Sequence, residues 1–189
     1  MRRGIYDQVR KRVSARKIFR RAATTHAAIQ GVVMTALVMS EKYGHVDAVR
    51  SGTKTHTLRI AKPGEVAGFY NGAACVYSAR NRVKWHVGCR RAIKAARTGR
   101  GLFYVRIVSI REMMLHEMND HLARKEGIQG SNTGLWGYQT NGVLRCEYDT
   151  PVAAFAALWD SIHGDGAFDK NPRVWAIGFE VENGTTRTY

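Results

Sequence analysis

The sequence predicts an α+β fold: a small mixed β-barrel with flanking helices and a basic N-terminal helical extension. Short segments in which apolar and polar residues alternate outnumber the segments with helical spacing, which favours a barrel over a helical bundle. The chain of 189 residues suits one domain with a sizeable core, preceded by a segment of different composition. We therefore divide it into an extension, residues 1–33, and one folded domain, residues 34–189.

The extension carries nine basic residues and one acidic residue. Ile5, Val9 and Val13 recur at helical spacing between basic side chains, which predicts a basic amphipathic helix. Two interpretations stay open: an arm that grips phosphate groups, or an added segment in front of a domain that begins near Met34. The side chains that such an arm would use are Arg10, Lys11, Arg12, Arg16, Lys17, Arg20 and Arg21.

Strands and helices follow in the domain. The strands are expected near residues 35–39, 54–60, 65–70, 73–78, 102–111 and 174–181. The helices are expected at residues 45–50, 118–125 and 152–162, the last with Pro151 in its first turn and Thr150 as N-cap. The glycine-rich residues 127–142 predict a long loop, and long loops in compact domains often serve as lids or binding loops.

The charge of the chain favours an anionic partner. There are 30 Lys and Arg residues against 15 Asp and Glu residues, a formal net charge of +15, which favours nucleic acid or an acidic membrane face. A second basic block, residues 75–110, carries nine basic residues and no acidic one, whereas residues 111–189 carry seven against eleven. Expected phosphate contacts in this block are Arg80, Arg82, Lys84, Arg90 and Arg91.

Cysteine and histidine usage and the lengths of the apolar stretches indicate the compartment and the kinds of ligand to expect. Cys75, Cys89 and Cys146 are widely spaced, without any Cys-x-x-Cys pair, which is typical of a reducing compartment such as the cytoplasm. His116 and His121 lie five residues apart, a spacing that separates them on a helix, so we expect no structural metal and no cofactor. No apolar stretch approaches the roughly 20 residues that span a bilayer, so no membrane partner is expected.

The densest group of polar side chains is residues 51–59, Ser-Gly-Thr-Lys-Thr-His-Thr-Leu-Arg. A strand that only fills a core would carry valine or isoleucine here, so the run indicates a site for a polar, anionic ligand. The alternative is a solvated strand after a glycine turn.

The alternation within this run assigns its side chains to two faces. Thr55, Thr57 and Arg59 share one face of the expected strand, and Leu58 and Ile60 face the core. We assign Thr55 and Arg59 to ligand binding. A structural ion pair is the alternative for Arg59.

Residues 52–59 resemble the Gly-x-Lys-Thr-x-Thr-x-Arg signature of the ASCH family, a branch of the PUA-like barrels. The resemblance covers residues 34–182, and the chain departs from the family between residues 75 and 101, which lack the expected tryptophan-bearing stretch. Other similar segments are an opening strand at 35–40, a helix at 45–50, a Pro-Gly turn at 62–65, an acidic helix end at 123–128, and a tail at 155–180 that resembles versions carried by phages and prophages.

The resemblance implies a catalytic set. Lys54, Thr57 and Glu126 occupy the positions where amidohydrolases of this family, which act on 4-acetylcytidine, carry a Lys, a Thr and a Glu. Lys54 would be either a neutral base beside Thr57, or a charged group that stabilises an oxyanion while Glu126 moves protons. Lys54 and Thr57 lie three residues apart and would point to opposite faces of a strand, so Lys54 must precede the strand proper.

Aromatic residues fall into two groups. Those on apolar helix and strand faces are assigned to the core, namely Phe155, Trp159, Trp175 and Phe179. Trp136 and Tyr138 lie in the glycine-rich segment, where they either stack on a base as ligand-binding residues or pin the segment to the barrel. The same alternatives apply to Trp85, which lies among basic residues.

The favoured hypothesis is a module that binds RNA or a modified nucleoside or nucleotide, with a base in the cleft and phosphates on the basic blocks. The first alternative is an amidohydrolase of 4-acetylcytidine-like acylated nucleosides, and ribonuclease activity is a variant that uses the same residues. The second alternative is a non-catalytic phage accessory protein that binds a host factor.

Overall fold

The computed structural model describes residues 36–182, so the predicted extension, with the seven basic side chains assigned to phosphate contacts, lies outside the described residues. The strands are β1 (Leu37–Val38), β2 (His56–Ile60), β3 (Val66–Tyr70), β4 (Ala73–Tyr77), β5 (Val83–His86), β6 (Arg90–Lys94), β7 (Phe103–Met114), β8 (Gln129–Gly130), β9 (Trp136–Thr140), β10 (Val143–Tyr148) and β11 (Arg173–Val181). The helices are α2 (His45–Arg50), α3 (Asp120–Lys125) and α4 (Pro151–His163), with a 3₁₀ turn η2 (Leu115–Glu117) before α3.

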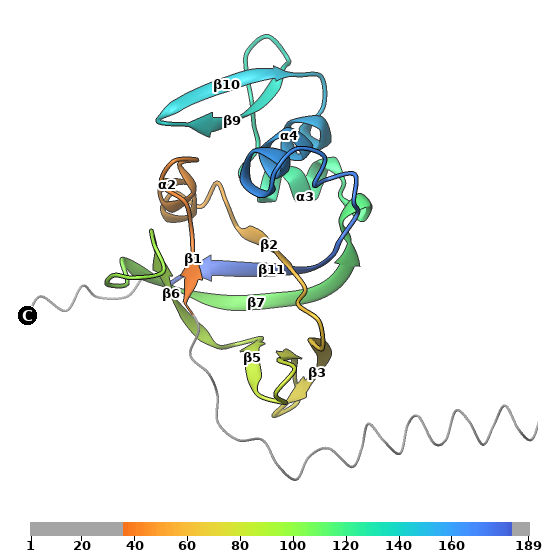
Figure 1. Cartoon of the computed structure of the whole chain (residues 1–189). Coiled ribbons are helices and arrows are strands. Elements are labelled where there is room, and N and C mark those ends of the chain that lie inside the picture. The colour runs from red at the N-terminus through yellow and green to blue at the C-terminus, as the bar shows by residue number, and fades with distance from the viewer. Residues whose placement is uncertain (1–35, 183–189) are drawn as a thin grey trace, which may run out of the picture.

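A curled five-stranded sheet, in the order β1-β6-β7-β11-β2, forms the centre of the fold (Figure 1). β1 runs parallel to β6, and the other neighbouring pairs are antiparallel. The two edges, β1 and β2, approach each other, since the Arg59 guanidinium of β2 donates to the Val38 carbonyl of β1 at 2.6 Å. The sheet is therefore a half-barrel, and the predicted α+β barrel-type fold is confirmed.

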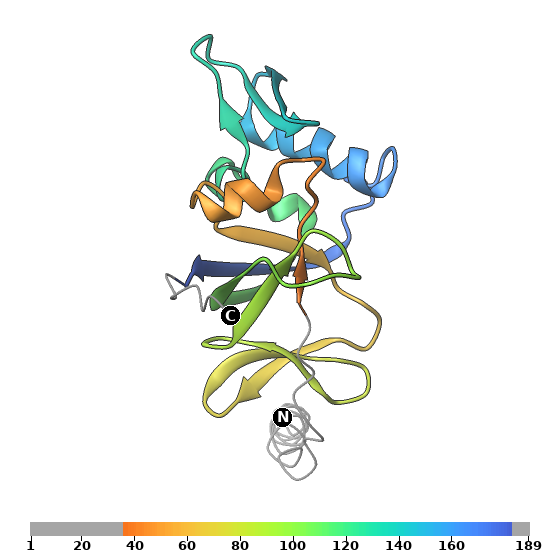
Figure 2. The ribbon, with the colours of Figure 1, turned by 90° about the vertical axis from the view of Figure 1, so that its left-hand side faces the viewer.

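Two smaller sheets lie on opposite sides of the central sheet (Figures 1 and 2). One contains β3, β4 and β5, and the other contains β10, β9 and β8. The second packs against α4, and α3 lies beneath α4 next to the central sheet. The helices α2, α3 and α4 lie together on one side of the central sheet, the side that β2 borders (Figure 1).

β11 connects the two hydrophobic cores because both of its faces are buried. Trp175, Ile177 and Phe179 belong to one core, and Val174 and Ala176 belong to the other. A strand that is covered on both faces carries a continuous apolar run, and β11 does so from position 174 to 179.

α4 begins as the sequence predicts. The Thr150 hydroxyl accepts a hydrogen bond from the Ala153 backbone N–H at 3.1 Å, and Pro151 occupies the first turn. Phe155 and Trp159 point from α4 into the core, which confirms their assignment.

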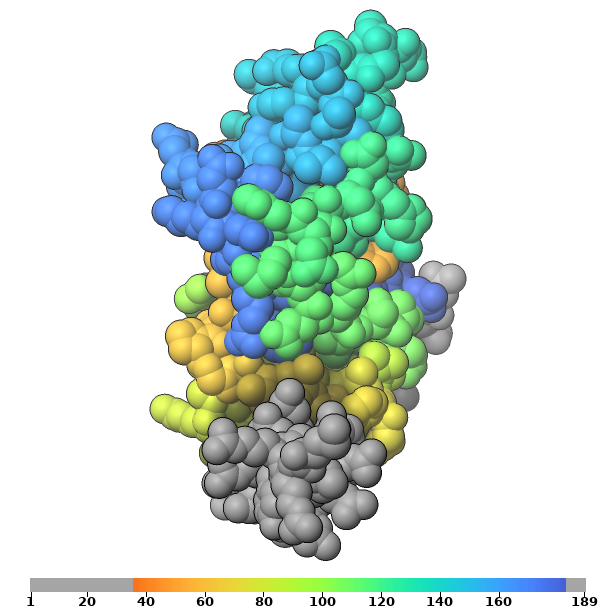
Figure 3. Space-filling model, turned by 90° about the vertical axis from the view of Figure 1, so that its right-hand side faces the viewer, coloured from red at the N-terminus to blue at the C-terminus, as the bar shows by residue number. Residues whose placement is uncertain are grey.

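The segment after α4 folds back onto the turn before α3. The His116 backbone N–H donates to Asn171 Oδ1 at 2.8 Å, and the His116 ring lies 3.0 Å from the Phe168 carbonyl oxygen. Figure 3 shows this face, where the segment after α4 in blue lies beside the η2 and α3 region in green. These contacts fix the direction in which β11 enters the central sheet.

The prediction of a long loop at residues 127–142 is wrong. Two strands, β8 and β9, lie within it, and β9 pairs with β10 as a hairpin. Asn141 and Gly142 connect them with φ angles of 53° and 80°, the left-handed conformations that a two-residue hairpin turn requires. The Asn141-Gly142 pair is a sequence signal for such a hairpin, but the many glycines of this segment led to the prediction of a loop.

Two further expectations fail locally. β5 and β6 lie where no strand is predicted, because basic residues interrupt the apolar alternation that buries Trp85, Arg91 and Ile93. Trp85 is a core residue, so it does not present a ring to a base. Leu58 is buried as predicted, but Ile60 is 43% exposed because β2 ends at this residue.

Candidate functional site

A cleft of 370 Å³ lies between the two edges of the central sheet and α4. Its walls come from β1 and the turn after it, from the start of α2, from β2, from the loop after β6, from the end of α3 and from α4 between Phe155 and His163. Three residues of the predicted site, Thr57, Arg59 and Glu126, line this one cleft. Residues 69 positions apart in sequence thus meet where the half-barrel stays open.

Glu126 and Lys54 form a buried ion pair at the base of the cleft. Glu126 is the C-cap of α3, and Lys54 precedes β2, as the strand geometry requires. Lys54 Nζ donates to Glu126 Oε2 and, at 2.5 Å, to the Glu126 backbone carbonyl. The next residue, Gly127, has a φ of 100°, and a Cβ there would lie 3.4 Å from Lys54 Cβ, so glycine suits both the turn and the close approach of the lysine.

Glu126 also accepts a hydrogen bond from the free edge of β2. Its Oε1 accepts a hydrogen bond from the Leu58 backbone N–H, which points away from β11. The carboxylate therefore has a fixed position, with one oxygen on the strand edge and the other on Lys54. An edge N–H satisfied by a side chain also prevents pairing with a further strand.

The Lys54 side chain is only 1% exposed and does not line the cleft. Burial lowers the pKa of Lys54, and Glu126 opposes this shift by favouring the charged ammonium. The group at the cleft wall is thus the Glu126 carboxylate, with Lys54 beneath it. For Lys54 to contact a ligand directly, the Glu126 side chain would have to move.

Thr57 places a hydroxyl on the same wall. The residue is buried, and no other residue of the described chain forms a hydrogen bond with its hydroxyl. A hydroxyl that has no internal partner, next to a fixed carboxylate, is available to a ligand.

Arg59 spans the cleft from β2 to β1. One terminal nitrogen donates to the Val38 carbonyl at 2.6 Å and lies 3.8 Å from Met39 Sδ. Burial lowers the pKa of Arg59, and Glu126 opposes this shift. Among residues 36–182, Arg59 forms no ion pair within 4.0 Å, and its hydrogen-bond partners are a carbonyl and a thioether.

Two histidines that the sequence analysis did not select also line the cleft. Burial, together with Lys54 and Arg59, lowers the pKa of His45 to about 2. Burial and Arg59 also lower the pKa of His163, whose ring packs 4.3 Å from that of Trp159. His45 is therefore neutral near pH 7, so its imidazole offers one donor and one acceptor to a ligand.

Two buried nitrogens at this cleft have no hydrogen-bond partner within residues 36–182: Arg59 Nε and Trp159 Nε1. Buried donors are almost always paired in native proteins, so each of these requires an explanation. Both nitrogens belong to side chains that line one cleft, where an acceptor group of a bound ligand would satisfy them.

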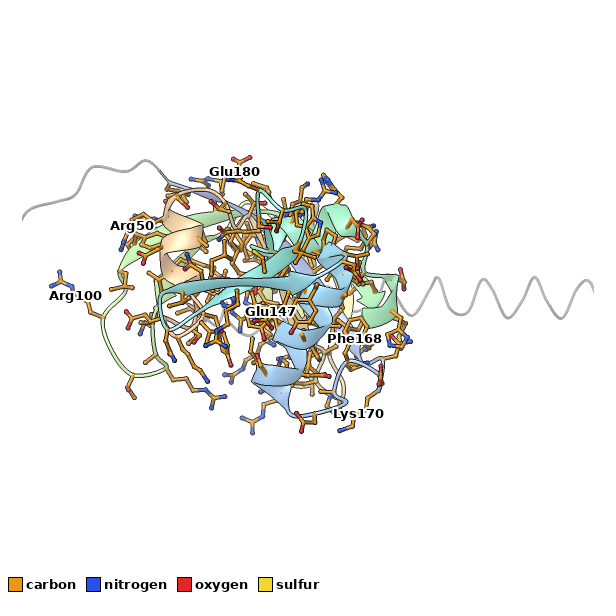
Figure 4. All side chains as sticks on the ribbon, turned by 90° about the horizontal axis from the view of Figure 1, so that it is seen from above. Arg50, Arg100, Glu147, Phe168, Lys170 and Glu180 are labelled. Atoms are coloured by element: carbon orange, nitrogen blue, oxygen red, sulfur yellow. The ribbon has the colours of Figure 1, made fainter. Side chains whose placement is uncertain are left out.

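The other predicted ligand-binding residues lie outside the cleft. The Thr55 hydroxyl lies 3.1 Å from His56 Nδ1. Trp136 lies under the Arg124 guanidinium, and Tyr138 packs beside Tyr148 at a hollow below the β9–β10 hairpin. That hairpin crosses above α4 (Figure 4), so both rings attach it to the body, which was the alternative reading of these residues.

The basic side chains that the sequence analysis selected from the second block differ in their surroundings. Arg80 and Arg82 are exposed. Lys84 pairs with Glu65 at 2.6 Å and covers the Trp85 ring, and Arg90 pairs with Glu182 at 2.6 Å. Arg91 is 2% exposed and donates to backbone carbonyls, so its guanidinium serves the sheet rather than a surface ligand.

Sequence reasoning missed His45, His163 and the role of Trp159 as a cleft wall. Trp159 is a core residue on one side and a cleft residue on the other, and periodicity reports only the first. Neither histidine carries a local signal, because the cleft depends on the crossing of β1 and β2 beside α4.

In the part of the chain that the structure describes, no group of three or more His, Cys, Asp or Glu side chains could hold a metal ion. None of the helices within residues 36–182 is both long and apolar enough to cross a bilayer.

No family model matches the chain, and no curated protein matches it. Among solved structures it is similar to an ASCH domain from Lactobacillus crispatus JV V101, with a TM-score of 0.44 and 13% identity over 76% of this chain and 75% of that chain. It is also similar to protein EF3133 of Enterococcus faecalis V583, from the family DUF984, with a TM-score of 0.47 and 12% identity over 92% of this chain and 95% of that chain. The first of these structures bears the name of the family that residues 52–59 resemble.

Proposed function

We propose that this protein is a nucleic-acid-binding domain of the ASCH, PUA-like type, whose cleft takes one nucleotide unit of RNA or a modified nucleoside. The observation that carries the proposal is the pair of unpartnered buried donors, Arg59 Nε and Trp159 Nε1, which belong to two side chains that line one cleft. A nucleobase is planar and carries carbonyl and ring-nitrogen acceptors, so it suits a cleft with an aromatic wall and donors available from its lining residues.

The remaining cleft residues support the same ligand. Phe155 and Trp159 offer apolar surface to a base, and neutral His45 can donate to or accept from its edge. Arg59 adds a positive charge near the open side, which favours the anionic phosphate of a nucleotide.

Calorimetric measurement of the affinity for cytidine 5′-monophosphate and for a short RNA tests this proposal. Trp159→Phe removes one unpartnered donor and keeps most of the ring, so we expect an affinity several-fold lower than that of the wild type. Trp136→Phe is the matched control, because Trp136 does not line the cleft. Equal affinities in the two variants would contradict the proposal.

A second candidate, hydrolysis of an acylated nucleoside such as 4-acetylcytidine, is favoured by one observation. The Thr57 hydroxyl and the Glu126 carboxylate line the same cleft, and Lys54 holds the carboxylate in place. In this reaction Thr57 Oγ adds to the acyl carbon while its proton passes to Glu126. The C–N bond then breaks, the proton moves to the leaving amine, and water hydrolyses the acyl-threonine.

Release of cytidine from 4-acetylcytidine tests the second candidate. Thr57→Val should abolish turnover and leave the stability nearly unchanged, because the hydroxyl has no internal partner among the described residues. Turnover that persists in Thr57→Val would exclude the threonine as nucleophile. If the wild type binds RNA but does not turn over 4-acetylcytidine, only the binding function remains.

A further inference from the structure

A second hollow, of 560 Å³, lies next to the cleft on the outside of the β1–β6 edge. It is lined by Ala36 and Val38, by side chains of β6, by Arg97 from the loop after β6, and by Tyr104 of β7. Val38 and Arg97 line both this hollow and the cleft, so the two adjoin at β1 and at the loop after β6.

The lining of this hollow is entirely cationic among its charged residues. Arg90, Arg91, Lys94 and Arg97 contribute to it, and among residues 36–182 no acidic residue does. A surface that served only solubility would mix both signs of charge. The hollow therefore selects an anion.

Two of these cations are engaged within the protein, and two are not. Arg90 pairs with Glu182 at 2.6 Å and lies 3.6 Å from the centre of the Tyr104 ring. Within residues 36–182, Lys94 and Arg97 take part in no ion pair, and Arg97 is exposed at the junction with the cleft. Their charges face the hollow with nothing in the described chain to neutralise them.

We propose that this hollow binds the phosphodiester groups next to the nucleotide held in the cleft, so that the ligand is a single-stranded nucleic acid rather than a free nucleoside. This inference rests on the proposed function of the cleft. Lys94 and Arg97 contact successive phosphates, while the cleft takes one unpaired base. A base in a duplex cannot enter the cleft without leaving its stack, which makes a single strand the matching ligand.

The test compares two ligands on the full chain: single strands of about ten nucleotides, within the usual site size for such proteins, and cytidine 5′-monophosphate. RNA and DNA strands of the same sequence are used in parallel, since both carry the same phosphodiester groups. Affinities are measured by fluorescence anisotropy and calorimetry over a range of salt concentrations.

The variant Lys94→Gln/Arg97→Gln removes the two unpaired charges from the hollow. Its control, Arg111→Gln/Lys170→Gln, removes the same charge elsewhere. Arg111 lies seven residues along β7 from Tyr104, a span of about 23 Å for a strand. Lys170 lies on the opposite side of the molecule from Arg100, which belongs to the same loop as Arg97 (Figure 4).

We expect the affinity for the ten-nucleotide strand to fall about tenfold in the first variant, and the salt slope of log affinity to become shallower by about 1.4, since each phosphate contact on a single strand contributes about 0.7. Its affinity for cytidine 5′-monophosphate should match that of the control. Equal strand affinities and slopes in the two variants would overturn the inference, as would an equal loss for both ligands.

A failure of the cleft proposal would look different. If Trp159→Phe changes the affinity of neither the mononucleotide nor the strand, the cleft is not the site and the proposed function fails with the inference. If Trp159→Phe weakens both ligands but Lys94→Gln/Arg97→Gln weakens neither, only the inference fails.

Discussion

Two glutamates are buried beside a lysine at different places in this molecule, Glu65 near the β3–β4–β5 sheet and Glu126 at the cleft. Glu65 accepts hydrogen bonds from Lys84 Nζ at 2.6 Å, from the Trp175 indole at 3.0 Å and from the Lys62 backbone N–H at 3.2 Å. Each of these donors comes from a different segment, so the carboxylate joins the small sheet to the central one. It does not line the cleft or the hollow beside it.

Glu126 is also fully engaged, by Lys54 and by the Leu58 N–H, but its surroundings differ. It borders an open cleft in which the donors of Arg59 and Trp159 have no partner within the described residues. A buried Lys–Glu pair alone therefore does not mark a site. The open cleft beside Glu126, which Glu65 does not border, distinguishes the two pairs. Unpartnered donors alone do not distinguish them, because Trp85 Nε1, next to Lys84, also has no partner within residues 36–182.

Removing the lysine of each pair should produce the largest difference between the two regions. Lys54→Met leaves the buried Glu126 carboxylate without its lysine partner, which should lower the free energy of unfolding by about 3–5 kcal/mol. Lys84→Met should cost less, about 1–3 kcal/mol, because Lys84 is 18% exposed and Glu65 keeps two other donors. Urea unfolding of both variants measures the difference, and equal losses would show that the two pairs are equivalent.

Acid should act on the two regions in different pH ranges. The folded protein holds the pKa of His45 at about 2, against 6.5 ordinarily, so the unfolded chain binds this proton first. Stability should therefore fall as pH drops below 6.5, by up to about 1.4 kcal/mol per pH unit from this residue. Burial alone would raise the pKa of Glu65, but hydrogen bonds from Lys84 and Lys62 lower it, so its stabilisation is present above 4.5 and is lost only below that pH.

Two variants separate these pH ranges. His45→Gln should reduce the slope of the stability profile between pH 6.5 and 4.5, where the lowered pKa values of His56 and His163 maintain the remaining slope. Glu65→Gln should reduce the slope only below pH 4.5. Urea unfolding at a series of pH values measures both profiles. A His45→Gln profile with the same slope as the wild type would mean that this imidazole is not kept neutral by the fold.

Neutralising each glutamate should separate ligand binding from structure. Glu126→Gln exchanges a cleft carboxylate for an amide, so we expect at least about a tenfold change in nucleotide affinity, or about 1.4 kcal/mol. Glu65→Gln should leave the affinity unchanged, because Glu65 does not line the cleft. Calorimetry with cytidine 5′-monophosphate makes the comparison, and an equal effect of both substitutions would remove the distinction.

The smallest expected effect on stability is that of Trp159→Phe. It removes an indole N–H that has no partner in the described chain, so the free energy of unfolding should change by less than about 1 kcal/mol. Trp175→Phe removes the donor to Glu65 and should be the more destabilising of the two. Thermal unfolding of the pair tests the order, and a larger loss for Trp159→Phe would contradict it.

The sequence predicted the half-barrel and part of the cleft because those features depend on local patterns. Thr150 and Pro151 mark the start of α4, and the polar run before and within β2 marks Thr57 and Arg59. The β5 and β6 strands and the hairpin at Asn141 were missed, since charge and glycine content outweighed the strand signals.

The rest of the site could not be predicted because it depends on how distant segments meet. His45 lines the cleft because β1, which precedes it, approaches β2. His163 lines the cleft because α4 lies over the gap between these two strands. Glu126 lines the cleft while Lys54 lies buried beneath it, a distinction that spacing along the chain does not contain.

The central claim, that the cleft beside Glu126 is the ligand site, can be tested most directly through the indole N–H signals of the four tryptophans in ¹⁵N-labelled protein. The wild type is titrated with cytidine 5′-monophosphate, and single Trp→Phe variants assign the signals. We expect the Trp159 signal to shift as its N–H gains an acceptor, while the Trp175 signal, already bonded to Glu65, stays in place. A saturating titration that leaves Trp159 unmoved would show that the nucleotide binds elsewhere.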